Sequence, residues 1–558
     1  MNGSQESMSK KLCANKVAVN TNQGQRFNQE ISQSNSSIKK RSKAYADFVV
    51  DDNPVHGIYL ASSWFITNLL FISAVIVQIF SVKLNFSAMQ KKNRTSHLAL
   101  GVPLIVLILL VNLPLVAFAQ VEPAPDPLRI PADDEPGAIH DPTLKVEQIV
   151  TGLKRPTAMA FLGNSSDDII VTEKDNGTVR RIIGGVIQPE PLVDVAVAND
   201  NDTNERGLLG MAVAQENETT TYVYLYYTES GGGQDGDDAD GVVPAGNRLY
   251  RYELVQDPLS GSTQLINPKL LLDLPARPGP RYNGGPVVVS QNANGTTVYV
   301  MIGDQDHHTS QAENYGDGPP PDGTGGIMAV DPEGNPLPAP VLVSPLNTQG
   351  ENGEEEEEEE ENDQEDIGML PYYYAYGIRN GFGLARDPVT GYLWDTENGP
   401  DWFDEINLVL PGFNSGWAAV QGPAAAPENE ESDIEEDLVD FGGTGVYRDP
   451  EFAWQNTVGV TAITFLNSAA LGQQYENDMF VGDINNGRLY HFDLSPDRTS
   501  LMFQGPLEDK VADNVDELNS VILGTGFRSI SDIEVGPDGY LYLLLYGPGR
   551  IYRISPAT

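Results

Sequence analysis

The chain has 558 residues, and its 79 acidic residues outnumber its 34 basic residues, which gives a formal net charge of −45. A polyanion of this size is a poor partner for nucleic acid and for anionic membrane surfaces, so we expect no nucleic-acid partner. The single cysteine, Cys13, excludes an intramolecular disulfide and a cysteine-based metal site.

The first 119 residues contain a polar tail followed by two hydrophobic segments. Residues 1–52 are rich in Ser, Asn, Gln and Lys without an apolar period, which predicts a disordered tail. Residues 58–82 form an apolar run that is long enough for a transmembrane helix. Residues 89–119 begin at a methionine and contain a basic cluster, an apolar run and a final Ala-Phe-Ala, the pattern of a secretory signal peptide.

Two interpretations of this region stay open. If the true start is Met1, the protein has a tail and a first span. If the true start is Met89, residues 1–88 are an artefact of the gene model. Residues 89–119 are then a cleaved signal peptide or a second transmembrane helix, and the Pro- and Asp-rich residues 120–143 are a linker. We expect an extracytoplasmic protein, either secreted or anchored through its N-terminal helix to the cytoplasmic membrane and facing outward.

From residue 144 to residue 558 one structural unit recurs six times. Each copy has an alternating apolar strand, a turn, a second apolar strand and, in most copies, a strand carrying Arg-Leu-Tyr or a similar triplet. The copies start near Pro156, Gly207, Gly284, Arg379, Thr461 and Ile530. Alternating strands bounded by Gly, Asp and Asn turns predict antiparallel sheets, and six such repeats predict an all-β, six-bladed β-propeller.

Two further segments belong to this propeller. A propeller closes when its two ends share a blade, and residues 146–150 have the pattern of the missing outer strand of the last blade. Residues 351–366 are dominated by glutamate, and like charges repel and do not pack. We interpret them as a solvated insertion between the third and fourth blades; a low-affinity cation-binding segment is the alternative.

The segments 378–383 and 396–407 carry the chemistry of the chain. They read Ile-Arg-Asn-Gly-Phe-Gly and Thr-Glu-Asn-Gly-Pro-Asp-Trp-Phe-Asp-Glu-Ile-Asn. Arginine supplies a permanent planar charge that matches carboxylates. A Gly-Pro turn can present free carbonyls, and calcium takes both carbonyl and carboxylate oxygens. This composition suits an anionic cofactor held beside a hard metal ion.

These residues resemble the glucose/sorbosone dehydrogenase family, the PQQ-dependent soluble aldose sugar dehydrogenases built on a six-bladed β-propeller. Three linked motifs, at residues 377–383, 396–408 and 411–417, carry a resemblance that covers roughly residues 144–554. It implies a quinoprotein dehydrogenase that oxidises an aldose sugar or a related alcohol, with hydride passing to PQQ beside a calcium ion. The sugar, the electron acceptor and the oligomeric state stay open.

The resemblance also implies which residues form the site. The cofactor-binding residues are Glu205, Arg379 and Asn380. The calcium ligands are Gly399 and Pro400 through their backbone carbonyls, together with Asp404 and Glu405, which match carboxylates associated with a further calcium. Tyr282 and Arg379 are the candidate catalytic residues.

Tyr282 departs from the family pattern. Typical members carry a histidine there as the general base, and imidazole suits this role because its pKa lies near ~6.5. A phenol with a pKa near ~10 costs roughly 4 kcal/mol more to ionise at neutral pH, unless Arg281 or calcium lowers its pKa. His307 and His308 are alternative bases that have the pattern of ordinary loop histidines.

Two other functions follow from this substitution and from the fold. A propeller that has lost its base would be a calcium-dependent module that binds a ligand or a partner. A calcium-dependent lactone hydrolase is a third reading, because propellers host several chemistries, but the chain carries no signature of it.

Overall fold

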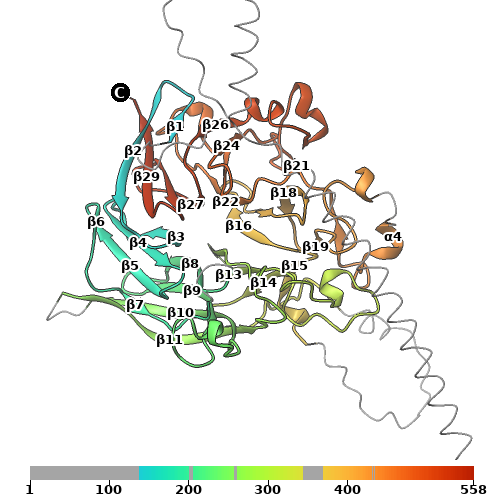
Figure 1. Ribbon diagram of the computed structural model, residues 1–558, viewed down its shortest axis with the longest axis horizontal. Helices are drawn as coiled ribbons and strands as arrows, with labels where there is room; N and C mark the ends of the chain where they lie inside the picture. The colour runs from blue at the N-terminus through green and yellow to red at the C-terminus, as the bar shows by residue number, and fades with distance from the viewer. Residues whose placement is uncertain are drawn as a thin grey trace, which may run out of the picture. The chain divides into compact units, whose positions relative to one another are not determined.

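Strands form nearly all the regular structure in the computed structural model, which describes residues 137–199, 205–256, 261–293, 295–343, 368–429, 432 and 434–557 (Figure 1). The predicted tail, both hydrophobic segments, most of the linker and the acidic insertion lie outside these residues. Within the described part of the chain, no helix is long and apolar enough to cross a bilayer.

The strands form six sheets, and the first three each begin with a run of consecutive antiparallel strands. The first sheet contains β3 (Pro156–Phe161), β4 (Asp168–Glu173), β5 (Thr178–Ile183), β6 (Val186–Ile187) and β7 (Val193–Asp194). The second contains β8 (Leu208–Gln215), β9 (Thr221–Glu229), β10 (Gly246–Gln256) and β11 (Thr263–Leu274). The third contains β12 (Val287–Asn292), β13 (Gly295–Ile302), β14 (Gly326–Val330), β15 (Tyr373–Tyr376), β19 (Phe413–Asn414) and β20 (Val446–Tyr447).

The remaining three sheets repeat this plan. The fourth contains β16 (Gly381–Arg386), β17 (Leu393–Glu397), β18 (Trp402–Val409), β21 (Phe452–Asn456) and β25 (Val511–Ala512). The fifth contains β22 (Val460–Phe465), β23 (Met479–Asp483), β24 (Leu489–Phe492), β26 (Ile522–Thr525) and β1 (Ala138–Ile139). The sixth contains β27 (Ile530–Val535), β28 (Leu541–Leu545), β29 (Arg550–Pro556) and β2 (Leu144–Thr151).

Helical structure is confined to single turns in the connections. The described turns are η1 (Asp237–Asp240), η2 (Gln311–Glu313), η4 (Leu370–Tyr372), η5 (Pro427–Asn429), α4 (Ile434–Asp437), η6 (Gln473–Tyr475), η7 (Gly505–Asp509) and η8 (Glu517–Ser520). Several of them add a buried side chain to the core, for example Leu370, Leu507 and Leu518, but strand residues make up most of these clusters.

The first strands of the six sheets form a closed ring. In chain order these strands are β3, β8, β12, β16, β22 and β27; each contacts the next, and β27 contacts β3 (Figure 1). The sheets therefore surround one axis, and the predicted all-β propeller is confirmed. The strand positions expected from the repeats agree with the observed strands.

The two ends of the propeller are joined by β2. This strand pairs antiparallel with β29, with Val146 opposite Ile554, and it is the outermost strand of the sixth sheet. The predicted closing strand is confirmed. The end of the predicted linker is also structured, because β1 pairs with β26 in the fifth sheet.

Apolar side chains fill the spaces between neighbouring sheets, because successive residues of a strand point to opposite faces. Between the fourth and fifth sheets, for example, Trp394, Phe452 and Trp454 pack against Val481 and Tyr490. Equivalent clusters join the other five pairs of neighbours, including the sixth sheet and the first. Burial of these faces on both sides of each sheet holds the ring together.

The space between the third and fourth sheets differs from the others. Leu393 and Val409 of the fourth sheet point into it, whereas Trp394 and Ile406 point toward the fifth sheet. By the same alternation this face also carries the polar residues Asp395, Glu397, Glu405 and Asn407, each at most 2% exposed. Buried acids thus stand where the other interfaces have apolar side chains.

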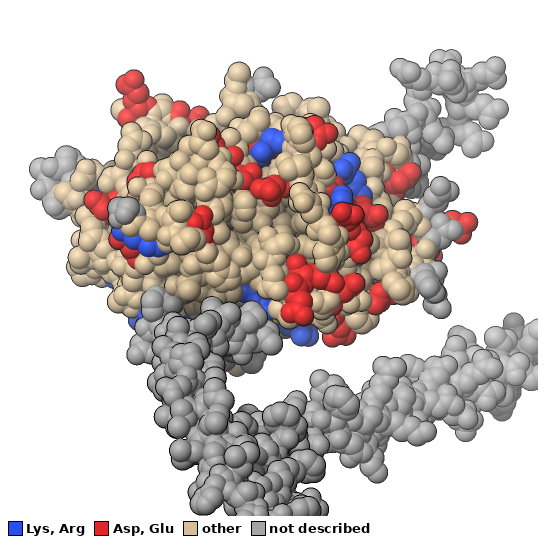
Figure 2. Space-filling view, turned by 90° about the horizontal axis from the view of Figure 1, so that it is seen from above, with Lys and Arg blue, Asp and Glu red and all other residues tan. Residues whose placement is uncertain are grey.

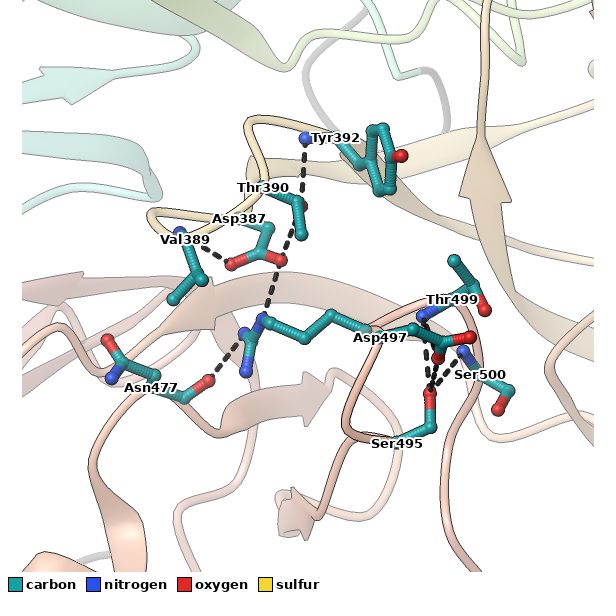
Figure 3. A network of polar contacts seen from close by, with 10 residues as sticks. Asp387, Val389, Thr390, Tyr392, Asn477, Ser495, Asp497, Thr499 and Ser500 are labelled. Carbon is teal, nitrogen blue, oxygen red and sulfur yellow. Dashed lines mark hydrogen bonds and ion pairs between the residues drawn. The ribbon is translucent and has the colours of Figure 1, made fainter.

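A polar contact also ties the fourth sheet to the fifth (Figure 3). Arg498 Nε lies 2.7 Å from Asp387 Oδ2, and Arg498 Nη2 donates to the carbonyl of Asn477 at 2.7 Å. Burial raises the pKa of Asp387, but hydrogen bonds from Arg498 and Thr390 outweigh it, and the pKa lies below its ordinary value. The turn after β16 is therefore anchored by a buried ion pair.

The surface reflects the acidic composition. On the face drawn in Figure 2, acidic side chains are spread widely and basic side chains form small groups beside them. Such a surface favours solubility and disfavours polyanionic partners.

We expect the free energy of unfolding to be larger at mildly acidic pH, near pH 5, than near pH 8. Burial raises the pKa of Asp483 to about 6, although Tyr490, Asn486 and Gly487 donate to its oxygens. Because the folded state then binds the proton more tightly, this contribution is present below the unfolded pKa and is lost as pH rises through about 6. Each pKa unit is worth about 1.4 kcal/mol.

Urea unfolding at the two pH values measures this difference. Asp483→Asn should shrink it, whereas Asp167→Asn, at an exposed turn, should leave it unchanged. Equal stabilities at both pH values, or an unchanged difference in Asp483→Asn, would contradict the prediction.

Candidate active site

A group of hydrogen-bonded residues surrounds Arg379 in the connections that lead into the ring of first strands. This arginine lies between β15 and β16 and is only 4% exposed. Its Nη2 donates to the hydroxyl of Tyr282 at 2.5 Å, and its Nη1 donates to the carbonyl of Asn398 at 2.8 Å. Its guanidinium carbon lies 4.2 Å from the ring centre of Tyr282 and 5.2 Å from that of Trp417. Its backbone N–H donates to Glu397 Oε1 at 2.7 Å.

Tyr282 is held in an unusual backbone conformation beside this arginine. Its φ is 61°, in the left-handed region, and its backbone N–H donates to Glu205 Oε2 at 2.5 Å. Burial raises the pKa of its phenol, and the charges of Arg379 and Arg281 oppose this only in part. Desolvation therefore outweighs the attraction of Arg281 and Arg379 for the ionised phenol.

The turn after Tyr282 needs glycine. Gly284 has a φ of 70°, and a Cβ atom there would lie 2.1 Å from the carbonyl oxygen of Met301. The missing side chain at Gly284 thus lets this turn approach β13 closely.

Glu205 connects this group to a central cavity. The cavity measures about 640 Å³, and all six first strands contribute to its wall. Glu205, Lys174, Asn380 and Asn398 also line it. Burial raises the pKa of Glu205 to about 7, against the opposing effects of the Tyr282 N–H and the Arg379 charge. Arg379 and Tyr282 do not line the cavity themselves.

Asp404 joins the Gly-Pro turn to the fifth sheet. Gly399 N–H donates to its Oδ1 at 3.1 Å, and the N–H groups of Val458, Gly459 and Val460 donate to its Oδ2 at 2.7, 2.7 and 3.3 Å. Four backbone donors thus occupy both oxygens, which gives this carboxylate a structural function. Its assignment as a calcium ligand stays a prediction.

Glu405 is also surrounded by donors. Gln421 Nε2 and Gly422 N–H donate to its Oε1 at 2.7 and 2.6 Å, and Asn407 Nδ2 donates to its Oε2 at 3.2 Å. Burial and then the charge of Glu397 raise its pKa well above the ordinary value. The predicted carbonyl ligands lie nearer the surface, since Gly399 is half-buried and Pro400 is exposed.

Next to Glu405 lie buried oxygens without partners. In the described part of the chain, neither side-chain oxygen of Asp395 has a hydrogen-bond partner, and the same holds for Asn407 Oδ1 and Gln421 Oε1. An all-oxygen donor set of this kind fits a hard cation such as calcium. The sequence analysis assigned no role to Asp395 or Glu397. In the antiparallel pairing of β17 with β18, Asp395 lies opposite Asn407 and Glu397 lies opposite Glu405.

The site also has free groups for an anionic cofactor. Arg379 Nε is a buried donor without a hydrogen-bond partner among the described residues, and the neighbouring Asn380 lines the cavity. A permanent cation beside an amide fits a ligand that carries carboxylates. The alternative bases stand apart, since His308 pairs with Asp322 at 2.9 Å and the side chain of His307 is 71% exposed.

Comparison with known proteins identifies the family. The family model of the glucose/sorbosone dehydrogenases matches residues 153–553. The chain therefore belongs to the glucose/sorbosone dehydrogenase family, as its motifs predicted. This membership places it among oxidoreductases of the sugar-dehydrogenase type.

Individual relatives are distant. An uncharacterized protein of Synechocystis sp. is 23% identical over 428 residues, which cover 75% of this chain and 87% of that protein. Aldose sugar dehydrogenase YliI of Escherichia coli is 28% identical over 193 residues, or 34% of this chain and 46% of that enzyme. Quinoprotein glucose dehydrogenase B of Acinetobacter calcoaceticus is 25% identical over 290 residues, or 49% and 52%. The matches span about half the length of the two named dehydrogenases.

Solved structures share the fold. A glucose dehydrogenase aligns with a TM-score of 0.52 at 22% identity, over 74% of this chain and 100% of that chain. The apo form of the soluble aldose sugar dehydrogenase of Escherichia coli aligns with a TM-score of 0.50 at 20% identity, with the same coverage. At these identities the similarity concerns the fold alone.

We expect Asp404→Ala to lower the free energy of unfolding by about 3 kcal/mol even in the presence of a metal chelator, because buried backbone donors lose a charged acceptor. Urea unfolding in EDTA measures this loss. The control is Asp401→Ala, which removes an exposed carboxylate three residues away and should have no effect. A loss that appears only when calcium is present would instead assign Asp404 to metal binding.

Proposed function

We propose that this protein is a quinoprotein dehydrogenase that oxidises an aldose sugar or a related alcohol with PQQ and calcium. The observation that carries the proposal is Arg379, a buried cation beside Asn380 at the end of the ring. A guanidinium with fixed geometry binds carboxylates in charge-assisted, bidentate hydrogen bonds, and PQQ carries three carboxylates. Family membership supports the same reaction class.

The residues of the chain have separate roles in this proposal. When bound, PQQ supplies an ortho-quinone that accepts two electrons from the alcohol. Arg379 and Asn380 hold its carboxylates and orient it over the cavity. The carbonyls of Gly399 and Pro400 and the carboxylate of Glu405 hold calcium, and the unpartnered oxygen of Asp395 supports a hard cation in that region.

A second function is favoured by one observation. Tyr282 replaces the usual base, and burial raises the pKa of its phenol. A propeller with the pocket but without an efficient base would bind a quinone or a calcium-dependent partner and turn over slowly. The dehydrogenase requires quinone binding and turnover, whereas the binding module requires only that a ligand or a partner binds.

We expect wild-type protein to bind PQQ in the presence of calcium and Arg379→Ala to lose this binding. Absorbance or fluorescence titration with PQQ measures it directly. Arg251→Ala is the matched control, because Arg251 is an arginine of the second sheet that pairs with Glu333. Absence of PQQ binding by the wild type, at any calcium concentration, would refute the dehydrogenase function.

With PQQ bound, Tyr282→His should increase aldose oxidation, because an imidazole accepts a proton more readily at neutral pH than a neutral phenol does. Steady-state assays with an artificial electron acceptor across a panel of aldoses compare the two proteins. Rapid turnover by the wild type, slowed by Tyr282→His, would show that the natural site already has a competent base.

We also propose an extracytoplasmic location, with the electron acceptor outside the cytoplasm. Cleavage after the Ala-Phe-Ala of residues 117–119 would give a mature chain that begins near Gln120. N-terminal sequencing of the native protein tests this, and recovery of chains that begin before Leu98 would indicate a membrane anchor.

A further inference from the structure

The group at the expected base position is poorly suited to accept a proton. The phenol oxygen of Tyr282 accepts a hydrogen bond from Arg379 Nη2 at 2.5 Å, and burial raises its pKa above the ordinary value of a tyrosine. A phenol in this state keeps its own proton at neutral pH and cannot take one from an alcohol. If the site oxidises alcohols, another side chain has to receive the proton.

Glu205 lies beside this position and borders the cavity. Its Oε2 accepts from the backbone N–H of Tyr282 at 2.5 Å, which sets the orientation of the carboxylate, and the backbone N–H of Asn283 also donates to it. The side chain lines the central cavity together with Asn380 and Asn398. A carboxylate held by backbone donors can still accept a proton from a ligand in the cavity, because each of its oxygens has more than one lone pair.

The charges around Glu205 come from three neighbouring elements. Arg379 and Arg281 favour the ionised carboxylate, whereas burial disfavours it more strongly and raises the pKa to about 7. Lys174 lines the same cavity, but its Nζ pairs with Asp175 at 2.8 Å. A pKa near the working pH is the condition under which a general base is most effective.

The other acids and bases of this region are engaged or remote. Asp304 is fully buried; Trp417 Nε1 donates to its Oδ2 at 2.7 Å, and the N–H groups of Asp306 and His307 donate to its Oδ1. His308 pairs with Asp322. Glu205 is therefore the carboxylate that borders the cavity beside the expected base position, whereas the other acids that line the cavity, Asp532 and Glu534, belong to β27 of the sixth sheet.

We propose that the carboxylate of Glu205 is the general base of this site and takes the hydroxyl proton of the substrate. This inference rests on the proposed dehydrogenase function. The O–H proton of the alcohol passes to Glu205 while the hydrogen on the same carbon leaves with its electron pair to the quinone, and the C–O bond becomes C=O. The alcohol loses two electrons, the quinone gains them, and Glu205 then releases its proton to water.

Glu205→Gln is the principal test, because glutamine keeps the shape and its Oε1 can still accept from Tyr282 N–H. With PQQ and calcium present, we expect kcat to fall about 10²–10⁴-fold. PQQ affinity, measured by titration without substrate, should change less than about threefold, and the melting temperature should confirm folding. In the wild type kcat/KM should rise with pH through about 7 and then level off, because the ionised carboxylate is the active form.

Tyr282→Phe separates the two neighbouring groups. This variant removes the phenol and keeps the backbone N–H that holds Glu205, so the pH dependence near 7 should persist. Loss of that dependence in Tyr282→Phe would make Tyr282 the base and overturn the inference. Glu205→Asp, which retains a carboxylate, should recover part of the lost rate and the ionisation in the pH profile.

The remaining outcomes distinguish failure of this inference from failure of the proposed dehydrogenase function. If the wild type binds no PQQ, the proposed function and the inference fail together. If it binds PQQ and oxidises aldoses while Glu205→Gln keeps the wild-type rate and pH profile, only the inference fails. A Gln variant that loses PQQ affinity as strongly as activity would make Glu205 a binding residue, and a wild type that binds PQQ without oxidising any alcohol would also overturn its role as base.

Discussion

Closure of the ring by β2 and β29 is the constraint on which the rest of this protein depends. The cavity exists because six first strands meet around one axis, and each supplies part of its wall. Glu205, Tyr282 and Arg379 lie in three different connections of this ring, so no single sheet contains the site. A propeller that opened between its sixth and first sheets would lose the cavity together with its packing.

Within the closed ring, buried charge determines what the site can do. Removing a guanidinium from water is costly, and the Tyr282 hydroxyl, the Asn398 carbonyl and two aromatic faces offset that cost for Arg379. The acids between the third and fourth sheets are compensated unequally, since donors surround Glu405 while Asp395 lacks them among the described residues, and burial raises the pKa of both. Such acids require either a proton or a cation, which connects the stability of this interface to pH and to metal binding.

The sequence predicted those parts of the structure that have a local pattern. Alternation located the first strands of all six sheets and the closing strand, and the three motifs directed attention to Arg379, Asn380 and Glu405, whose roles stay predictions. The two-residue strands β1, β6, β7, β19, β20 and β25 were missed, because strands this short are fixed by their neighbours and not by their own residues. The four backbone donors around Asp404 were equally hidden, since main-chain N–H groups are the same in every sequence.

The contact between Tyr282 and Arg379 shows why the substitution of a catalytic histidine is ambiguous from sequence alone. The two residues are 97 positions apart, and their 2.5 Å hydrogen bond depends on the packing of two loops. In that packing the phenol is held as a neutral partner of the guanidinium. The neighbouring carboxylate of Glu205 is desolvated, which raises its pKa to about 7. The same burial that disables the tyrosine as a base therefore prepares the glutamate, and the loss of a histidine from a motif need not mean the loss of a proton acceptor from the site.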